Sequence, residues 1–141
     1  MTPQERAERC ADLMWSGDRA SQGLGMRLLD VGPGRATLEM TVGEQMVNGH
    51  GIGHGGFTFA LADSAFAFAC NSYNRRTVAH ECEIRYLAPT RLDDRLVAEA
   101  VERSRSGRDG VYDVTVRCED TVVAQFLGRS KEIRGVFFEE E

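Results

Sequence analysis

The 141-residue sequence predicts an α+β domain in which a long antiparallel sheet wraps around one buried helix. Three observations predict this fold class. Residues 57–70 are apolar around almost the whole circumference of a helix and must therefore be covered on several sides. Six other segments have strand-like patterns, and the glycine-containing turn at residues 104–110 is typical of a hairpin. The order of a helix, two strands, the central helix and four strands is typical of one α+β domain.

The first segment, residues 1–23, is expected to form a helix followed by a linker. Thr2 precedes Pro3, and Glu5 follows three residues after Thr2. This pattern is a capping box, in which Thr2 caps the helix, Pro3 fits the first turn and Glu5 reaches back to the start. The polar residues 16–18 are expected to end the helix.

Strands are expected on both sides of the central helix. Residues 35–42 alternate apolar and polar side chains, which is typical of a strand with one buried face. The expected strands span residues 26–31, 35–42, 78–87, 95–103, 111–118 and 122–133. Residues 134–141 are expected to form a loose acidic tail, so the chain, residues 1–141, is interpreted as a single domain.

Composition limits the partners and the location of the protein. The net charge of −5 argues against nucleic acid as a partner, because binding to phosphate backbones requires a basic face. The first ten residues are polar and include acids, so they do not resemble a signal or transit peptide. No apolar run approaches the ~18 residues of a membrane span, so we expect no membrane partner and a cytoplasmic protein.

Metal sites and disulfides are not expected. The four cysteines are far apart in the sequence and form no Cys-x-x-Cys pair, so they are interpreted as reduced thiols. His50 and His54 are four residues apart, but they lie in a glycine-rich loop without a third ligand at a suitable spacing. The sequence therefore predicts no metal ion in the functional site.

Asp63 is the main candidate for a catalytic group. It lies within the apolar helix, where a carboxylate loses several kcal/mol of solvation unless it is paired or protonated. One interpretation is structural, with Asp63 bonded to a backbone group or an arginine. The other is functional, with a carboxylate whose burial prepares it to act as a base or a nucleophile.

The start of the same helix is a second candidate element. His54, Gly55 and Gly56 place free backbone N–H groups at the positive end of the helix dipole, where they can hold an oxyanion. Gly55 and Asp63 are separated by eight residues, which is roughly 12 Å along a helix at ~1.5 Å per residue. Because one carbonyl group cannot contact both, we expect two helices to pack antiparallel in a dimer, with each site shared between two chains.

The segment from Asn48 to Asp63 has the pattern N-G-x-G-x-x-H-G-G-x-x-x-x-L-x-D, which resembles the hotdog-fold acyl-CoA thioesterases. Residues 54–73, HGGFTFALADSAFAFACNSY, are similar to the PaaI type of this family, which is associated with bacterial phenylacetate breakdown. The resemblance extends from about residue 24 to residue 133 and includes the segment Ile84-Arg85-Tyr86-Leu87-Ala88-Pro89. It implies the hotdog fold, with the sheet wrapped around the central helix.

The resemblance also implies roles for individual residues. Asp63 would act as general base or nucleophile, and the Gly55 N–H would polarise the thioester carbonyl. Asn48 would position the carbonyl or the attacking water, and His54 would orient the loop and the thioester. Gly56 and Tyr86 would contact the substrate. Some relatives carry an assisting serine where this sequence has Ala79, so the choice between nucleophile and base stays open.

Coenzyme A would be held as part of the substrate, so no separate cofactor is implied. Relatives bind its phosphates with a hairpin, which here supplies Arg105, Gly107 and Arg108, with Lys131 nearby. Arginine suits phosphate because it makes bidentate, charge-assisted bonds. The family builds its sites at dimer interfaces, often within tetramers, which implies a homodimer and a dimer of dimers.

The resulting hypothesis is a thioester hydrolase that converts a phenylacetyl-CoA, its ring-hydroxylated form or a similar aryl or medium-chain acyl-CoA to the free acid and CoA. One alternative is an acyl-CoA-binding sensor without turnover, for which a buried acid such as Asp63 would be unnecessary. Another alternative is a hotdog hydratase or dehydratase, whose typical His-Phe-Pro pattern is absent from this sequence.

Overall fold

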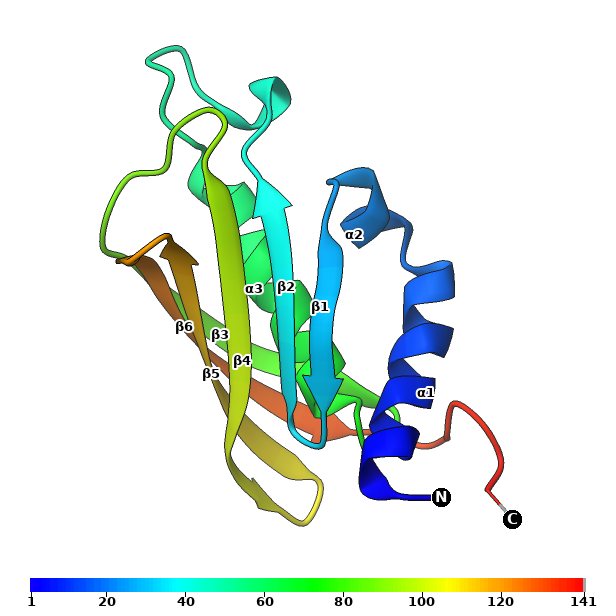
Figure 1. The fold of residues 1–141 in the computed structure, drawn as a ribbon. Coiled ribbons are helices and arrows are strands. Elements are labelled where there is room, and N and C mark those ends of the chain that lie inside the picture. The colour runs from blue at the N-terminus through cyan, green and yellow to red at the C-terminus, as the bar shows by residue number, and fades with distance from the viewer. Residues whose placement is uncertain (141) are drawn as a thin grey trace.

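The computed structural model describes residues 1–140 and contains a six-stranded antiparallel sheet that curves around one long helix (Figure 1). The order of strands in the sheet is β1-β2-β4-β5-β6-β3. The elements are α1 (Pro3–Gly17), α2 (Arg19–Gly23), β1 (Arg27–Gly32), β2 (Arg35–Thr41), the 3-10 turn η1 (Glu44–Met46), α3 (Gly55–Cys70), β3 (Thr77–Tyr86), β4 (Arg95–Ser106), β5 (Asp109–Cys118) and β6 (Thr121–Glu132). This confirms the predicted hotdog arrangement.

The core lies between α3 and the concave face of the sheet. Leu61, Phe66 and Phe68 of α3 are fully buried, and α3 packs mainly against β2, β4 and β5. The ring of Phe66 occupies the space beside Gly128 of β6, where a Cβ atom would lie 2.7 Å from Phe66 Cε1. Gly128 therefore allows the helix to approach the sheet closely at this point.

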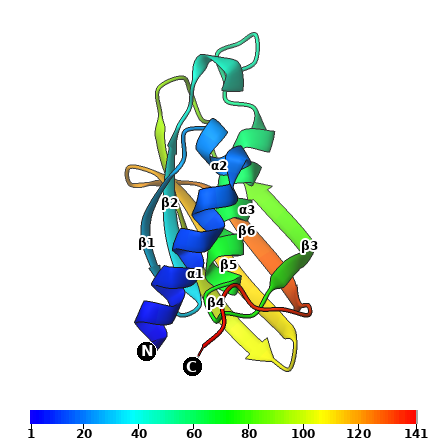
Figure 2. The ribbon, with the colours of Figure 1, turned by 90° about the vertical axis from the view of Figure 1, so that its right-hand side faces the viewer.

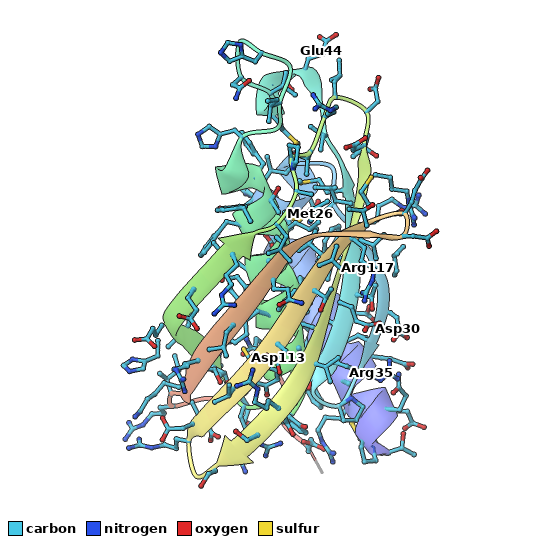
Figure 3. All side chains as sticks on the ribbon, turned by 90° about the vertical axis from the view of Figure 1, so that its left-hand side faces the viewer. Met26, Asp30, Arg35, Glu44, Asp113 and Arg117 are labelled. Atoms are coloured by element: carbon cyan, nitrogen blue, oxygen red, sulfur yellow. The ribbon has the colours of Figure 1, made fainter. Side chains whose placement is uncertain are left out.

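The two faces of the sheet differ in chemistry, as the alternation of the strands predicts. Along β5, Val114 and Val116 point into the core, whereas Asp113 and Arg117 project from the face remote from α3 (Figure 3). Side chains of successive residues in a strand point to opposite faces, so one face is apolar and the other is charged.

The N-terminal helix begins as predicted. The Thr2 hydroxyl accepts from the Glu5 N–H at 3.1 Å, and the Thr2 N–H donates to the Glu5 carboxylate at 3.3 Å. The region expected to be a linker contains the extra short helix α2, whose first turn is capped by the Asp18 side chain. Figure 2 shows α1 running beside the sheet on the side that carries α3.

The hairpin between β4 and β5 is tighter than the expected turn over residues 104–110. Strand pairing continues to Ser106 and Asp109, so that only Gly107 and Arg108 remain in the turn. Gly107 has a φ of +62°, a conformation that glycine adopts without steric cost.

The central helix begins at Gly55, two residues before the start expected from the sequence.

Residues 134–140, for which the sequence predicts a loose tail, lie against the body of the protein beside α1 (Figure 2). The side chain of Asn74 donates to the Phe138 carbonyl at 2.9 Å and accepts from the Phe137 N–H at 2.9 Å and the Phe138 N–H at 3.3 Å. Glu140 forms an ion pair with Arg6 at 2.9 Å. Polar contacts distant in sequence therefore fix this segment.

Two exposed features lie on the same side of the molecule as α3. Strand β3 is an edge of the sheet, and most of its residues are exposed. The face of α3 around Asp63 carries the small residues Gly56, Ala60 and Ala67 together with the half-buried Phe59. No helix within residues 1–140 is long and apolar enough to cross a membrane.

Candidate active site

The first turn of α3 contains one backbone donor that is free to bind a ligand. The His54 N–H donates to the Met46 carbonyl at 2.7 Å, the Gly56 N–H donates to His54 Nδ1 at 3.0 Å, and the Phe57 N–H donates to the His54 carbonyl at 3.1 Å. The Gly55 N–H has no partner among residues 1–140. This donor lies at the positive end of the helix dipole, where an oxyanion is stabilised.

The Gly55 N–H borders an open groove of about 490 Å³. The groove is formed by the first turn of α3 and the segment that follows β3, and most of its lining is apolar. It includes Ile52, Tyr86, Leu87, Pro89 and Val123. A groove of this size and composition can hold a drug-sized apolar group next to the amide donor.

Asp63 lies in the middle of α3 and is half-buried. Burial raises the pKa of its carboxyl group above the ordinary value of an aspartate. Within residues 1–140 the Asp63 side chain makes no hydrogen bond or ion pair, so the structural interpretation, in which a backbone group or an arginine satisfies it, has no support in this chain. A carboxylate with a raised pKa and free oxygens is suited to accept a proton.

Two thiols lie close enough to Asp63 to be affected by its charge. Burial is the main cause that raises the pKa of Cys70 to about 12 and the pKa of Cys82 to about 11, and the charge of Asp63 adds to both shifts. Both thiols are therefore protonated at neutral pH.

No three His, Cys, Asp or Glu side chains of the described residues are grouped so that they could hold a metal ion.

A single chain does not bring Gly55 and Asp63 together. The two residues lie eight positions apart on one straight helix, and therefore about 12 Å apart at ~1.5 Å per residue. Asp63 shares the half-exposed face of α3 with Ala60 and Ala67, which leaves room for another surface to approach the carboxylate. The structure thus places both residues on one continuous helix, which is the premise of the separation expected from the sequence.

Asn48 organises the glycine-rich loop that leads into α3. Its side-chain oxygen accepts from the His50 N–H at 2.9 Å and from the Ile52 N–H at 3.2 Å. Gly51, with a φ of +75°, provides the turn between these two donors. The side-chain oxygen of Asn48 is therefore occupied within its own loop, and its NH2 group remains as the part that can contact a ligand.

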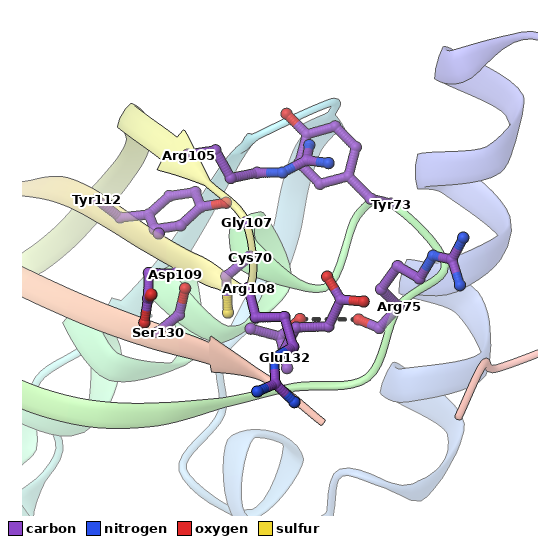
Figure 4. Close-up of a pocket in the computed structure, with 12 residues that line it drawn as sticks. Cys70, Tyr73, Arg75, Arg105, Gly107, Arg108, Asp109, Tyr112, Ser130 and Glu132 are labelled. Atoms are coloured by element: carbon purple, nitrogen blue, oxygen red, sulfur yellow. Dashed lines mark hydrogen bonds between the residues drawn. The ribbon is translucent and has the colours of Figure 1, made fainter. Parts of the chain in front are cut away.

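The predicted CoA-binding residues gather at the opposite end of α3, around the β4–β5 hairpin (Figure 4). Arg105, in the part of β4 next to the turn, stacks its guanidinium 3.6 Å from the centre of the Tyr73 ring, and Arg108 lies in the turn that follows. Lys131 forms an ion pair with Asp109 at 3.1 Å and is less available than the arginines.

Arg75 lies beside the same hairpin, and sequence reasoning did not single it out. Together with Arg105 and Arg108 it lines a small cavity of about 20 Å³, and none of the three forms an ion pair with a described residue. Arg75 follows the end of α3 by five residues, far from the hairpin in sequence. Only the folded topology brings these arginines together.

Comparisons with known proteins show the family of the chain. The family model of the thioesterase superfamily matches residues 50–125. The sequence is 40% identical over 131 residues to the acyl-coenzyme A thioesterase PaaI of Escherichia coli K12. The aligned region covers 92% of this chain and 94% of that protein.

Solved structures show the same similarity. The structure of the E. coli PaaI protein matches with a TM-score of 0.93 and 38% identity, over 96% of this chain and 99% of that one. A mutant of the phenylacetic acid degradation protein PaaI from Thermus thermophilus matches with a TM-score of 0.80 and 38% identity, over 82% of this chain and 100% of that one.

Proposed function

The chain belongs to the thioesterase superfamily and is an acyl-CoA thioesterase of hotdog fold, and on this premise we propose that its substrates are aryl-acyl thioesters such as phenylacetyl-CoA or hydroxyphenylacetyl-CoA. The observation that carries the proposal is the unpaired Gly55 N–H beside the apolar groove. The thioester carbonyl accepts from this N–H, and the acyl group occupies the groove. An aromatic ring suits this groove because most of its lining is apolar and its volume is about 490 Å³.

Hydrolysis proceeds by attack of water on the thioester carbonyl. Asp63 removes a proton from the water, the new C–O bond forms, and the negative charge that develops on the carbonyl oxygen is stabilised by the Gly55 N–H. The carbonyl then re-forms as the C–S bond breaks, the acid is released, and the CoA sulfur takes the proton that Asp63 holds. We assign Asp63 the role of general base because its raised pKa strengthens it as a proton acceptor.

A single-turnover reaction in ¹⁸O-labelled water distinguishes this role from nucleophilic attack. If Asp63 is a base, the label appears in the released acid and not in the protein. If Asp63 attacks the carbonyl, an anhydride forms and CoA leaves, and the label enters the Asp63 carboxylate when water attacks the Asp63 carbonyl carbon of the anhydride. Labelled Asp63 in a tryptic peptide would therefore contradict the general-base assignment.

We propose that each site is shared between two chains of a homodimer. Pairing of two β3 edges would bring the small-residue faces of two α3 helices together, and an antiparallel arrangement would place Gly55 of one chain near Asp63 of the other. Dimers of this kind are proposed to associate further into a homotetramer, which light scattering after size-exclusion chromatography would measure.

Mixed dimers test the shared site. Asp63→Asn and Gly55→Val are each expected to be inactive, and mixing them by unfolding and refolding gives about half mixed dimers, each with one intact site. About a quarter of the wild-type activity is then recovered. Because every chain carries one lesion, a site contained within one chain cannot regain activity, and absence of recovery would contradict the shared site.

The proposed dimer also indicates which residues would bind the CoA phosphates. The hairpin lies at the end of α3, about 24 Å from Gly55 of its own chain at ~1.5 Å per residue. In the proposed antiparallel dimer, the α3 helix of the partner would begin near this hairpin. The pantetheine arm has about a dozen bonds, equal to about four residues and ~14 Å when extended at ~3.5 Å per residue. We therefore assign the phosphates to Arg105 and Arg108, with Gly107 allowing a close approach and with Arg75 contributing.

The first test of the function is CoA release from a panel of acetyl, medium-chain, long-chain and phenylacetyl thioesters. Phenylacetyl-CoA is expected to have the highest kcat/KM, and Asp63→Asn is expected to lower kcat about 10²- to 10⁴-fold, the usual contribution of a positioned base. Asp120→Asn, which removes an exposed carboxylate in the β5–β6 turn, is the matched control.

The outcomes separate the alternatives. Turnover of aliphatic thioesters alone would reject the aromatic substrate and retain the mechanism. CoA binding without turnover of any thioester would favour a binding protein. A cytoplasmic location and a role in phenylacetate breakdown are also proposed, because the phenylacetic acid degradation protein of T. thermophilus is 38% identical to this chain.

A further inference from the structure

Tyr86, at the end of β3, is hydrogen-bonded to the helix start that forms the candidate oxyanion site. Its hydroxyl donates to the Gly55 carbonyl at 2.9 Å. The tyrosine ring also lies against the Gly55 Cα, since a Cβ atom at Gly55 would come within 2.9 Å of Tyr86 Cζ. Gly55 therefore has no side chain at the one place where this ring approaches the helix, and the hydroxyl is engaged with the backbone.

The bond from Tyr86 is the first of two that act on one peptide group. The Gly55 carbonyl and the Gly56 N–H belong to the same peptide, and the Gly56 N–H donates to His54 Nδ1 at 3.0 Å. A hydrogen bond to the oxygen of a peptide polarises it and strengthens the N–H of that peptide as a donor. The Tyr86 hydroxyl, the Gly55–Gly56 peptide and the His54 ring therefore form one continuous chain.

The direction of this chain determines where His54 carries its proton. A backbone N–H can only donate, so Nδ1 of His54 must act as the acceptor and the ring proton must lie on Nε2. Nε2 has no partner among the described residues, and the His54 side chain is exposed. The Nε2–H is thus a second donor, on the residue that precedes Gly55, and it is free to bind a ligand.

We propose that Tyr86 is a positioning residue that holds His54 in the Nε2–H tautomer, so that His54 and Gly55 present two neighbouring donors to the thioester. This inference rests on the proposed function, and it gives Tyr86 a role through His54 instead of a direct contact with substrate. Tyr86→Phe is the appropriate change, because it keeps the ring packed on Gly55 and removes only the hydroxyl.

The first measurement is ¹⁵N NMR of the histidine rings, which reports the tautomer directly. The chain has three histidines, so His50→Asn and His80→Gln spectra identify the His54 signals. In the wild type, His54 Nδ1 is expected at the position of a bare acceptor nitrogen and Nε2 at that of a protonated one. In Tyr86→Phe the two shifts are expected to move toward each other as the second tautomer becomes populated.

Tyr112→Phe is the matched control, because it also removes a tyrosine hydroxyl, one bonded to Glu102 at 3.2 Å in a different part of the protein. Its His54 shifts are expected to equal those of the wild type. Unchanged His54 shifts in Tyr86→Phe, or equal changes in both variants, would overturn the proposal whatever the activities are.

The second measurement is steady-state kinetics of Tyr86→Phe. Loss of one positioning hydrogen bond is expected to lower kcat about fivefold and to leave KM within about twofold. A changed tautomer with unchanged kcat would overturn the positioning role. If the wild type hydrolyses no thioester, the proposed function fails, and the NMR comparison still decides whether Tyr86 controls the His54 tautomer.

Discussion

The docking of the C-terminal segment by Asn74 permits a quantitative prediction. Asn74 adopts a φ of +57°, and its side chain satisfies three backbone groups, the N–H groups of Phe137 and Phe138 and the carbonyl of Phe138. It also donates to the Glu140 carboxylate at 3.1 Å, so at about 1 kcal/mol for each of the four hydrogen bonds, loss of the side chain costs about 4 kcal/mol of docking free energy. Alanine adds about 1 kcal/mol because it disfavours a positive φ, whereas glycine does not.

Amide hydrogen exchange at Arg76 measures this docking, because the Arg76 N–H donates to the Gly135 carbonyl at 3.0 Å. With a tenfold change for each 1.4 kcal/mol, protection is expected to fall about 700-fold in Asn74→Gly and about 4,000-fold in Asn74→Ala. Equal protection in the two variants would refute the backbone argument. Wild-type protection in both would refute the argument that Asn74 holds the segment.

Four further predictions concern the core and the site. Gly128→Ala is expected to lower the free energy of unfolding, measured by urea denaturation, by about 2–3 kcal/mol, because the new Cβ atom meets the Phe66 ring. The control is Gly43→Ala, whose Cβ atom would have no neighbouring atom within 4 Å and is expected to change this free energy little. Because burial raises the folded-state pKa of Asp63, its carboxylate destabilises the fold at neutral pH, and Asp63→Asn should raise Tm there. The gain in Tm should vanish as the pH falls below about 4, where the carboxyl group is protonated in both the folded and the unfolded chain. A gain in Tm that is independent of pH would contradict this. Wild-type kcat/KM should fall as the pH is lowered through this raised pKa, so a titration at the ordinary aspartate value would be the contrary result. In Gly55→Ala the new Cβ atom meets the Tyr86 ring and displaces the residue-55 N–H, so kcat should fall about 10²-fold. The same change in a Tyr86→Ala background, where the ring is absent, should lower kcat much less.

The sequence was sufficient for the features that depend on local pattern. The composition of residues 57–70 predicts a helix that must be covered, and the position of Asp63 within it predicts a carboxylate with a perturbed pKa. The spacing of Gly55 and Asp63 predicts their separation, because a helix has a fixed rise per residue.

Features that depend on long-range contacts could not be predicted in the same way. Histidine is not among the usual helix caps, so the bond between His54 Nδ1 and the Gly56 N–H had no sequence signal. The docking of residues 134–140 depends on Asn74, more than 60 positions away. The grouping of Arg75 with the hairpin arginines likewise requires the folded topology.

The protonation of the cysteines has a consequence for the acyl group. A thioester can pass its acyl group to any nearby thiolate, and such an exchange would compete with water for the substrate. Burial raises the pKa of all four cysteines, and Cys70 and Cys82, which lie closest to Asp63, reach about 12 and 11. Burial therefore disfavours the thiolate form of each cysteine, so the protein's own sulfur atoms compete less effectively with water for the acyl group.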